Sequence, residues 1–271
     1  MKLNIDNKPG GMVFNKDFEV FVQQNNLLDF DTVMTFKDGE VVKHAVPERK
    51  TEKFFLKEDD TSLHVYLKRH YPQSFPKVLF QAMKLSRSET AFDEFHYIVD
   101  FHTADLPTMI PIAAGVRRVG LFGKESFLVT KAIEGCVRLD HFFSPGSRVS
   151  RRQRRAVLKK VALMVKKMHD AGFNHRDLYL CHILFDNVKE LFFVDLHRVE
   201  KRKQVPDRWK VKDIAALHYS APKETISRSD RLFFLKTYFE AERLSGEERR
   251  FAIKVLKKTK KMIEHNENKA Q

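Results

Sequence analysis

Two aspartates in the second half of the sequence have the setting that phosphoryl transfer requires. Asp177 lies in the stretch His175–His182, and Asp195 follows the apolar segment Leu191–Val194. A long predicted helix places Asp177 on a loop, and a tight predicted hairpin brings Asp195 alongside it. One carboxylate can then accept the proton of an acceptor hydroxyl, while the other binds the Mg²⁺ that bridges the ATP phosphates. We therefore predict Asp177 as the catalytic base and Asp195 as the magnesium ligand.

Protein kinases contain these residue types in the patterns H-R-D-x-x-x-x-N and D-F-G. His175, Arg176 and Asp177 match the first triplet, and Asp195 opens the second. His182 occupies the position of the asparagine, although magnesium prefers oxygen ligands to imidazole. A metal-binding role for His182 and a role in orienting a phosphate or the acceptor both stay open.

A strand lysine paired with a helix glutamate is needed upstream to hold the α- and β-phosphates. Lys68 closes a predicted strand and Glu94 lies in the next predicted helix, so we predict this pair; the alternative is a strand-end charge and a solvated helix residue. No Gly-rich loop is visible. The turn 47–51 offers Arg49 and Lys50 for phosphate binding, or is a plain basic turn.

The surrounding pattern predicts an α+β fold with a strand-rich first lobe and a helical second lobe. Residues 1–36 are expected to form an N-terminal extension, residues 37–133 the nucleotide-binding lobe, and residues 134–271 the lobe with the catalytic loop and the acceptor site. The expected elements are strands at 40–46, 53–56, 62–68, 121–122, 126–129, 183–185 and 191–194, and helices at 86–100 (with a capping box from Ser86 to Glu89) and 150–171.

The stretch 175–182 together with 194–198 resembles the lipopolysaccharide kinase family (Kdo/WaaP type), and within it the inner-core heptose kinases most of all. Residues 66–70 and 208–213 are similar to that family as well. The resemblance implies a protein-kinase-like bilobal fold, ATP, Mg²⁺ and a sugar hydroxyl of the lipopolysaccharide core as acceptor. It also implies that Asp213 braces the catalytic loop from the helix behind it.

The acceptor side is predicted from residues close to the two aspartates. Arg176, His197, Arg198 and Trp209 are candidate acceptor-binding residues; the alternatives are loop pairing for Arg176 and a core position for Trp209. About 17 residues separate Asp195 from Asp213, and no A-P-E motif follows. This argues for a small acceptor rather than a peptide.

The formal charge of +14 and the pI near 9.7 point to anionic partners. The run Arg148–Lys167 contains nine cations and no acid. It is interpreted as a solvated helix face, as a contact with the anionic inner-membrane surface, or as a site for an acidic partner; no pattern favours nucleic acid. With two cysteines and no apolar stretch of roughly 20 residues, we expect a cytoplasmic protein, peripheral at the inner membrane in one interpretation.

Other functions stay open at this point. The same chemistry would serve a Kdo sugar, an aminoglycoside-like molecule or a protein tyrosine as acceptor. A scaffold related to pseudokinases, which binds an acidic partner or a membrane through the basic helix, is the alternative without catalysis.

Overall fold

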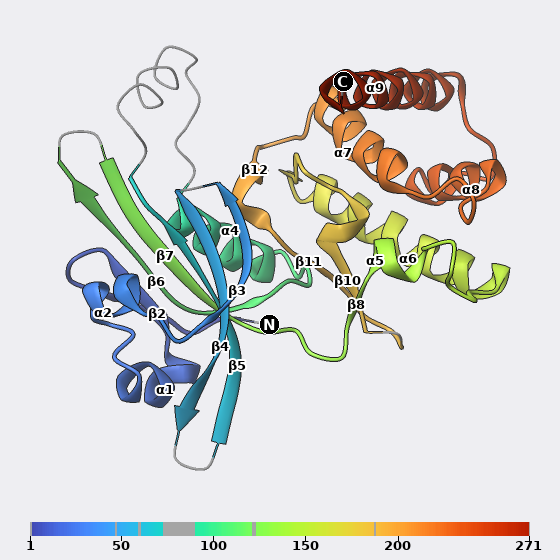
Figure 1. Ribbon diagram of the computed structural model, residues 1–271. Helices are drawn as coiled ribbons and strands as arrows, with labels where there is room; N and C mark the ends of the chain where they lie inside the picture. Colours follow the sequence, from blue (N-terminus) through green and yellow to red (C-terminus); the bar gives the residue numbers. More distant parts are fainter. Residues whose placement is uncertain are drawn as a thin grey trace. The chain divides into compact units, whose positions relative to one another are not determined.

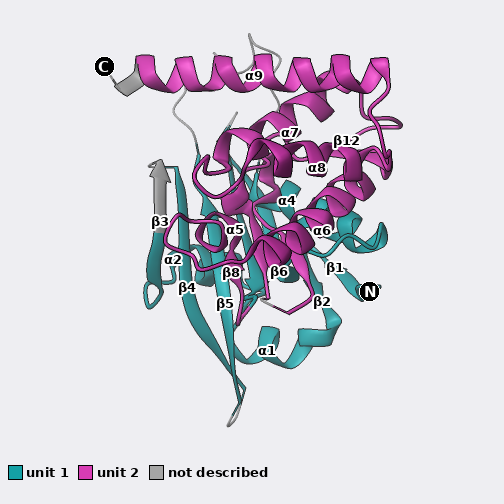
Figure 2. Cartoon of the chain, turned by 90° about the vertical axis from the view of Figure 1, so that its right-hand side faces the viewer, with its two compact units in different colours: residues 1–133 teal, residues 134–271 magenta. Residues whose placement is uncertain are grey.

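Strands predominate in the first half of the chain and helices in the second. The computed structural model describes residues 2–46, 48–58, 61–72, 90–120, 123–186 and 188–270. Contacts divide the chain into unit 1, Met1–Ile133, and unit 2, Glu134–Gln271 (Figures 1 and 2). The division falls at the position where the sequence analysis placed the end of the nucleotide-binding lobe.

Unit 1 is built on a seven-stranded antiparallel sheet with the strand order β1-β2-β6-β7-β5-β4-β3. Its strands are β1 (Ile5–Lys8), β2 (Met12–Asn15), β3 (Glu40–Val46), β4 (Arg49–Glu58), β5 (Thr61–His70), β6 (Ile110–Val119) and β7 (Gly123–Lys131). In β5, Val65 and Leu67 are fully buried whereas Tyr66 and Lys68 are partly exposed. This alternation is the period of two that a strand imposes, and it sends Lys68 to the face opposite Leu67.

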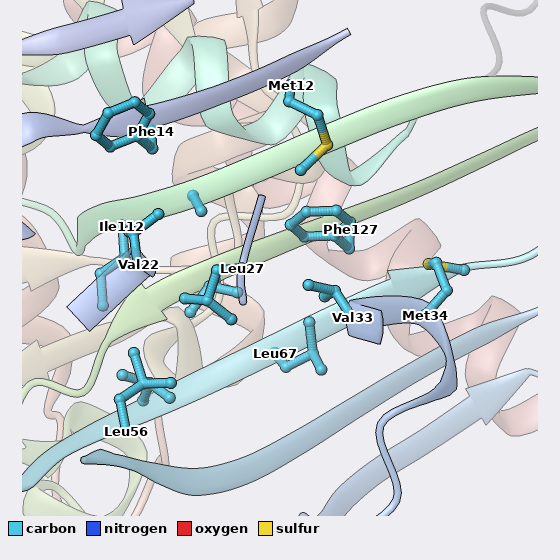
Figure 3. Packing of buried hydrophobic residues seen from close by; sticks show 13 residues of the cluster. Met12, Phe14, Val22, Leu27, Val33, Met34, Leu56, Leu67, Ile112 and Phe127 are labelled. Atoms are coloured by element: carbon cyan, nitrogen blue, oxygen red, sulfur yellow. The ribbon is translucent and has the colours of Figure 1, made fainter. Parts of the chain in front are cut away.

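The first 36 residues belong to this sheet and its core, which differs from the expected extension. They contain β1, β2, the 3₁₀ turn η1 (Lys16–Phe18), and the helices α1 (Glu19–Gln24) and α2 (Phe30–Thr35). Met12 and Phe14 of β2, Val22 of α1 and Val33 of α2 are buried in one cluster with Phe127 of β7 (Figure 3).

A buried arginine joins this N-terminal segment to the rest of the sheet. Arg69 Nη1 donates to the carbonyl oxygens of Met34 at 2.7 Å and Phe36 at 2.9 Å, just where α2 ends. Its Nη2 pairs with the carboxylate of Glu52 on β4, which is itself fully buried. The carbonyl oxygens at the end of α2 and the Glu52 carboxylate therefore compensate the charge of Arg69, which would be costly to bury alone.

Several predicted boundaries need correction. The prediction for β3 is confirmed, but β4 begins at Arg49, so Arg49, Lys50 and Thr51 lie in a strand and not in a turn. Helix α4 (Ala91–Thr103) begins after Thr90, whose side chain forms a capping box with Asp93. The predicted cap from Ser86 to Glu89, the predicted strand 121–122 and Pro47 of the predicted turn lie outside the described residues.

Unit 2 is mainly helical. Its helices are α5 (Leu139–Phe142), α6 (Arg151–Asp170), α7 (Asp207–Ser220), α8 (Arg228–Tyr238) and α9 (Gly246–Ala270). Its short strands form two small antiparallel sheets: β8 (Val137–Arg138), β10 (Ile183–Phe185) and β11 (Leu191–Phe193) in one, β9 (Phe173–Asn174) and β12 (Glu200–Lys201) in the other. The strand-rich unit 1 and helical unit 2 confirm the predicted α+β class.

Helix α6 confirms the predicted long helix. Ser150 and Gln153 form its capping box, and Val157, Val161 and Val165 contribute to its buried face. Gly172 follows it with a φ of +87°, and a Cβ there would meet the carbonyl oxygen of Arg202. Glycine at this position lets the chain turn directly from α6 into β9 and the loop that follows it.

Among the described residues, no helix combines the length and the apolar character needed to cross a membrane.

Candidate functional site

The loop that carries Asp177 is held from behind by a buried carboxylate. Asp213 of α7 accepts the backbone N–H of His175 through Oδ2 and that of Arg176 through Oδ1, both at 2.7 Å, and its side chain is fully buried. Arg176 has a φ of +69°, a left-handed conformation that is unfavourable for a residue with a side chain. Two charge-assisted hydrogen bonds on consecutive amides fix this strained turn, and Asp177 is the next residue.

Two further side chains orient Asp213, and the sequence analysis did not anticipate them. His169, at the end of α6, lies with Nε2 3.3 Å from Asp213 Oδ2, and its Nδ1 lies 2.8 Å from the hydroxyl of Tyr238. Because the carboxylate can only accept, the consistent arrangement is that Tyr238 donates to His169 and His169 donates to Asp213. The pKa of the Tyr238 hydroxyl is raised well above its ordinary value, first by burial and then by nearby carboxylates.

Asp177 is held by an arginine from the segment after Asp195. Arg198 Nη1 donates to both carboxylate oxygens of Asp177, at 2.8 and 2.9 Å. The Asp177 side chain is 18% exposed, so it is reachable from solvent. The pairing joins two segments that are 21 residues apart, and it orients the carboxylate.

Asp195 sits at a second left-handed turn, with φ +62° and ψ +58°, between β11 and the 3₁₀ turn η3 (Leu196–Arg198). Its Oδ1 accepts from His197 Nδ1 at 2.7 Å, and its Oδ2 lies 3.5 Å from His182 Nε2. Since Val194 N donates to the His182 carbonyl at 3.0 Å, the hairpin brings Asp195 beside the loop, as the spacing predicted.

His182 is the link between the two aspartates. Its Nδ1 donates to the backbone carbonyl of Asp177 at 2.7 Å, so Nε2 is the atom that faces Asp195. Burial lowers the pKa of His182, but a hydrogen bond with Cys181, the negative charge of Asp195 and the Asp177 carbonyl outweigh it and leave the pKa above 6.5. His175 stacks on its ring at a centroid distance of 6.0 Å. With Nδ1 on the Asp177 carbonyl and Nε2 beside the Asp195 carboxylate, His182 is placed to orient both segments.

Trp209, the single tryptophan, lies on α7 and is partly exposed rather than part of the core. Four cationic groups lie 5.4–5.5 Å from its ring centroid: Arg176, Arg202, Arg208 and Lys212. We call these five residues the Trp209 cluster. One carboxylate, Glu200, binds both Arg176 (2.8 Å) and Arg202.

In unit 1 the predicted lysine–glutamate pair is formed. Lys68 Nζ of β5 lies 2.7 Å from Glu94 Oε1 of α4, and the Glu94 side chain is fully buried. Lys50 Nζ lies 2.7 Å from Glu52 Oε1, and Arg49 opens β4 beside it. Lys50 therefore pairs with the same buried carboxylate that binds Arg69.

The cations of α6 divide into two groups. Arg154 and Arg155 bind the two carboxylate oxygens of buried Asp230 on α8, at 3.0 and 3.2 Å, and so stabilise the contact between the helices. Five others are exposed to solvent, namely Arg148 ahead of the helix and Arg151, Arg152, Lys159 and Lys167 within it, while Lys160 and Lys166 are partly buried. The basic run is thus partly structural and partly an exposed positive surface.

Unit 2 also contains a large apolar cavity of about 990 Å³. Helices α6, α7, α8 and α9 line it, with Leu158, Ile214, Leu235 and Val255 among the lining residues.

The carboxylate arrangement fits a magnesium ion that arrives with a nucleotide. Within the described residues no group of three or more His, Cys, Asp or Glu side chains could hold a metal on its own. Magnesium needs no such cage, because phosphate oxygens and waters complete its coordination around one or two carboxylates. Asp195, with a side chain that is 21% exposed, offers one such carboxylate.

Comparison with known proteins identifies the family. The model of the "Lipopolysaccharide kinase (Kdo/WaaP) family" matches residues 35–238. The lipopolysaccharide core heptose(I) kinase WaaP of Pseudomonas aeruginosa is 39% identical over 158 residues, which are 55% of this chain and 59% of that protein. The Escherichia coli protein of the same name is 29% identical over 226 residues, 78% of this chain and 82% of that one.

A solved structure extends the similarity to nearly the whole chain. "WaaP in complex with acyl carrier protein" matches with a TM-score of 0.70 and 30% identity, and the match covers 94% of this chain and 98% of that one. The fold is accordingly protein-kinase-like. From the family match and these relatives we conclude that the chain belongs to the lipopolysaccharide kinase (Kdo/WaaP) family of sugar phosphotransferases.

Proposed function

We propose that the chain transfers the γ-phosphoryl group of ATP to a heptose hydroxyl of the lipopolysaccharide inner core. The observation that carries this proposal is the loop of unit 2, in which Asp213 fixes the backbone before Asp177 and His182 joins Asp177 to Asp195. The choice of heptose as acceptor is supported by the heptose(I) kinases WaaP, which are 29–39% identical to this chain.

In this proposal Asp177 accepts the proton of the attacking hydroxyl. Arg198 keeps the Asp177 carboxylate oriented before the acceptor arrives. The left-handed turn at Arg176 sets the direction of the backbone that leads into Asp177. Such a base contributes roughly 10²–10⁴-fold to the rate of transfer. Arg198 and His197 remain candidates to contact the acceptor once it is bound.

Asp195 would hold Mg²⁺, which when bound neutralises charge on the phosphates. His197 and His182 flank its carboxylate and orient it, so the asparagine of protein kinases is replaced here by a positioning group rather than by a second metal ligand. In unit 1, Lys68 would bind the α- and β-phosphates, with Glu94 holding its ammonium group in place.

The test is transfer of labelled γ-phosphate from Mg·ATP to dephosphorylated lipopolysaccharide core. The wild-type chain should label the heptose, and Asp177→Asn should lose at least about 100-fold in kcat while its affinity for Mg·ATP changes little. Asp195→Asn, which preserves the left-handed turn, should lose magnesium-dependent nucleotide binding as well. Labelling at the wild-type rate in Asp177→Asn would refute the assignment of the base. Labelling of a Kdo sugar instead of the heptose would show that the acceptor was assigned wrongly.

We also propose an acyl carrier protein as an acidic partner. The matched structure is of WaaP in complex with such a carrier, and this chain offers an exposed basic surface (Arg148, Arg151, Arg152, Lys159) and an apolar cavity lined by α6–α9 that an acyl chain could enter. Binding should weaken with salt and in Arg151→Glu/Arg152→Glu, and should strengthen when the carrier is acylated. Salt-independent binding, or equal affinity for the unacylated carrier, would contradict it.

In the cell we place the chain in the cytoplasm, with the same basic surface available to the anionic face of the inner membrane. Co-sedimentation with vesicles containing anionic lipid, in the presence and absence of the carrier protein, separates a membrane contact from a protein contact.

A further inference from the structure

The Trp209 cluster gathers four cations around one indole ring. Two of them, Arg176 and Arg202, bind the carboxylate of Glu200. Arg208 and Lys212 form no hydrogen bond or ion pair with any residue that the structure describes. Their contacts are with the face of the indole ring, at 5.5 Å from its centroid.

Lys212 is the most unusual member, because it is half-buried. Burial lowers the pKa of its ammonium group, and the positive charges of Arg198 and Arg176 lower it further; the negative charges of Asp177 and Asp213 act in the opposite direction. A cation that is desolvated among other cations is unfavourable unless an anion compensates it. The proposed transfer chemistry makes no use of Lys212, Arg202 or Arg208.

The cluster adjoins the proposed base within the same unit. Arg176 is the residue before Asp177, and Lys212 is the residue before Asp213, whose carboxylate binds the Arg176 amide at 2.7 Å. A group bound among these cations would therefore lie close to the hydroxyl that is presented to Asp177.

We propose that the Trp209 cluster is an oxyanion subsite, which binds a phosphate or carboxylate group on a sugar next to the one that is phosphorylated. The inference rests on the proposed function and names a feature of its acceptor: an anionic oligosaccharide rather than a neutral one. Guanidinium and ammonium groups supply the charge-assisted hydrogen bonds, and the indole supplies an apolar face for a sugar ring.

The single tryptophan allows a direct binding test that needs no catalysis. The probe is glucose 6-phosphate, with glucose as the uncharged control, titrated against the full-length chain while the fluorescence of Trp209 is followed. We expect a saturable response to glucose 6-phosphate alone. Its dissociation constant should rise about tenfold in Lys212→Met and in Arg208→Gln, as expected for loss of one charge-assisted hydrogen bond.

Two variants serve as controls. Lys212→Arg should restore most of the affinity, because it returns a donor and a charge. Lys257→Met removes the same charge from an exposed position on α9 and should leave the dissociation constant unchanged. Arg208 is exposed on α7, so Arg208→Gln tests the subsite even if Lys212→Met is poorly folded.

A nucleotide could supply the same oxyanion, so the titration is repeated with saturating Mg²⁺ and a non-hydrolysable ATP analogue. A response that persists assigns the subsite to the acceptor, whereas one that disappears assigns it to the nucleotide and overturns the proposal. Equal responses to glucose, or affinities unchanged in Lys212→Met and Arg208→Gln, overturn it as well. Because binding is read separately from transfer, a chain that binds the sugar phosphate without phosphorylating any core sugar would refute the proposed function and leave the subsite intact.

Discussion

The hydrogen bonds from Asp213 to the loop amides lead to a quantitative prediction for Asp213→Asn. The asparagine keeps one oxygen, so it can accept only one of the two N–H groups of His175 and Arg176, and its NH₂ group faces the other. One charge-assisted hydrogen bond is lost, at about 1.5–3 kcal/mol, and a buried N–H is left without an acceptor, at about 1–3 kcal/mol. Because these two losses overlap, we expect unit 2 to be destabilised by about 2–4 kcal/mol.

Two measurements check this. Urea denaturation gives the free energy of unfolding, and amide hydrogen exchange shows whether protection is lost at His175 and Arg176 before it is lost elsewhere in unit 2. Transfer should slow through kcat, with little change in the KM for ATP, because the loop and not the lysine–glutamate pair is disturbed.

The matched control is Asp207→Asn, which removes an exposed carboxylate from the first turn of the same helix. Its only expected effect is the loss of a favourable interaction with the helix dipole, below about 1 kcal/mol. If Asp213→Asn were as stable as this control, and His175 and Arg176 stayed protected, the brace would not depend on the charge of Asp213.

Three further predictions follow from buried or coupled charges. Burial alone raises the pKa of Asp230, but hydrogen bonds from its serine and arginine partners outweigh it and lower the pKa below 3.8. This stabilisation is therefore present above pH 3.8 and lost as the pH falls through the folded pKa, so the difference in unfolding free energy between wild type and Asp230→Asn should shrink below pH 3.8. Glu52→Gln should cost about 3–5 kcal/mol by leaving Arg69 buried without its partner, and thermal or urea unfolding of Glu52→Leu/Arg69→Met should show much of this recovered. The raised pKa of His182 means that its attraction to Asp195 is complete below pH 6.5 and is lost as the pH rises through the folded pKa; an NMR titration should give a midpoint above 6.5 that moves down in Asp195→Asn.

Local sequence patterns were sufficient to predict those helices and strands whose formation depends on neighbouring residues in the chain. The predicted strands 40–46 and 183–185 match β3 and β10, and the capping residue and apolar stripe of α6 place that helix to within a residue. Asp177 and Asp195 could be related because a loop and one hairpin connect them, whereas the bracing role of Asp213 was implied only by the family resemblance.

Pairings between segments that are far apart in the sequence could not be predicted from local patterns. The four-residue strands β1 and β2 have little pattern of their own, and they are strands because β2 pairs with β6, which lies far along the chain. Similarly, the contacts of Arg198 with Asp177 and of Tyr238 with His169 depend on side chains that meet only after packing. The position of Arg198 three residues after Asp195 was the signal that singled it out, but no sequence pattern indicated that it pairs with Asp177.

The buried Arg69 has a practical consequence for shortening this protein. A chain that starts at Lys37, where the sequence analysis placed the start of the nucleotide-binding lobe, would lack the carbonyl oxygens of Met34 and Phe36 that bind this guanidinium, and would lack β1 and β2 of the sheet. The apolar residues that those segments cover, including Phe127, would face water. Such a fragment should aggregate on expression, and limited proteolysis of the intact chain should leave the first 36 residues attached.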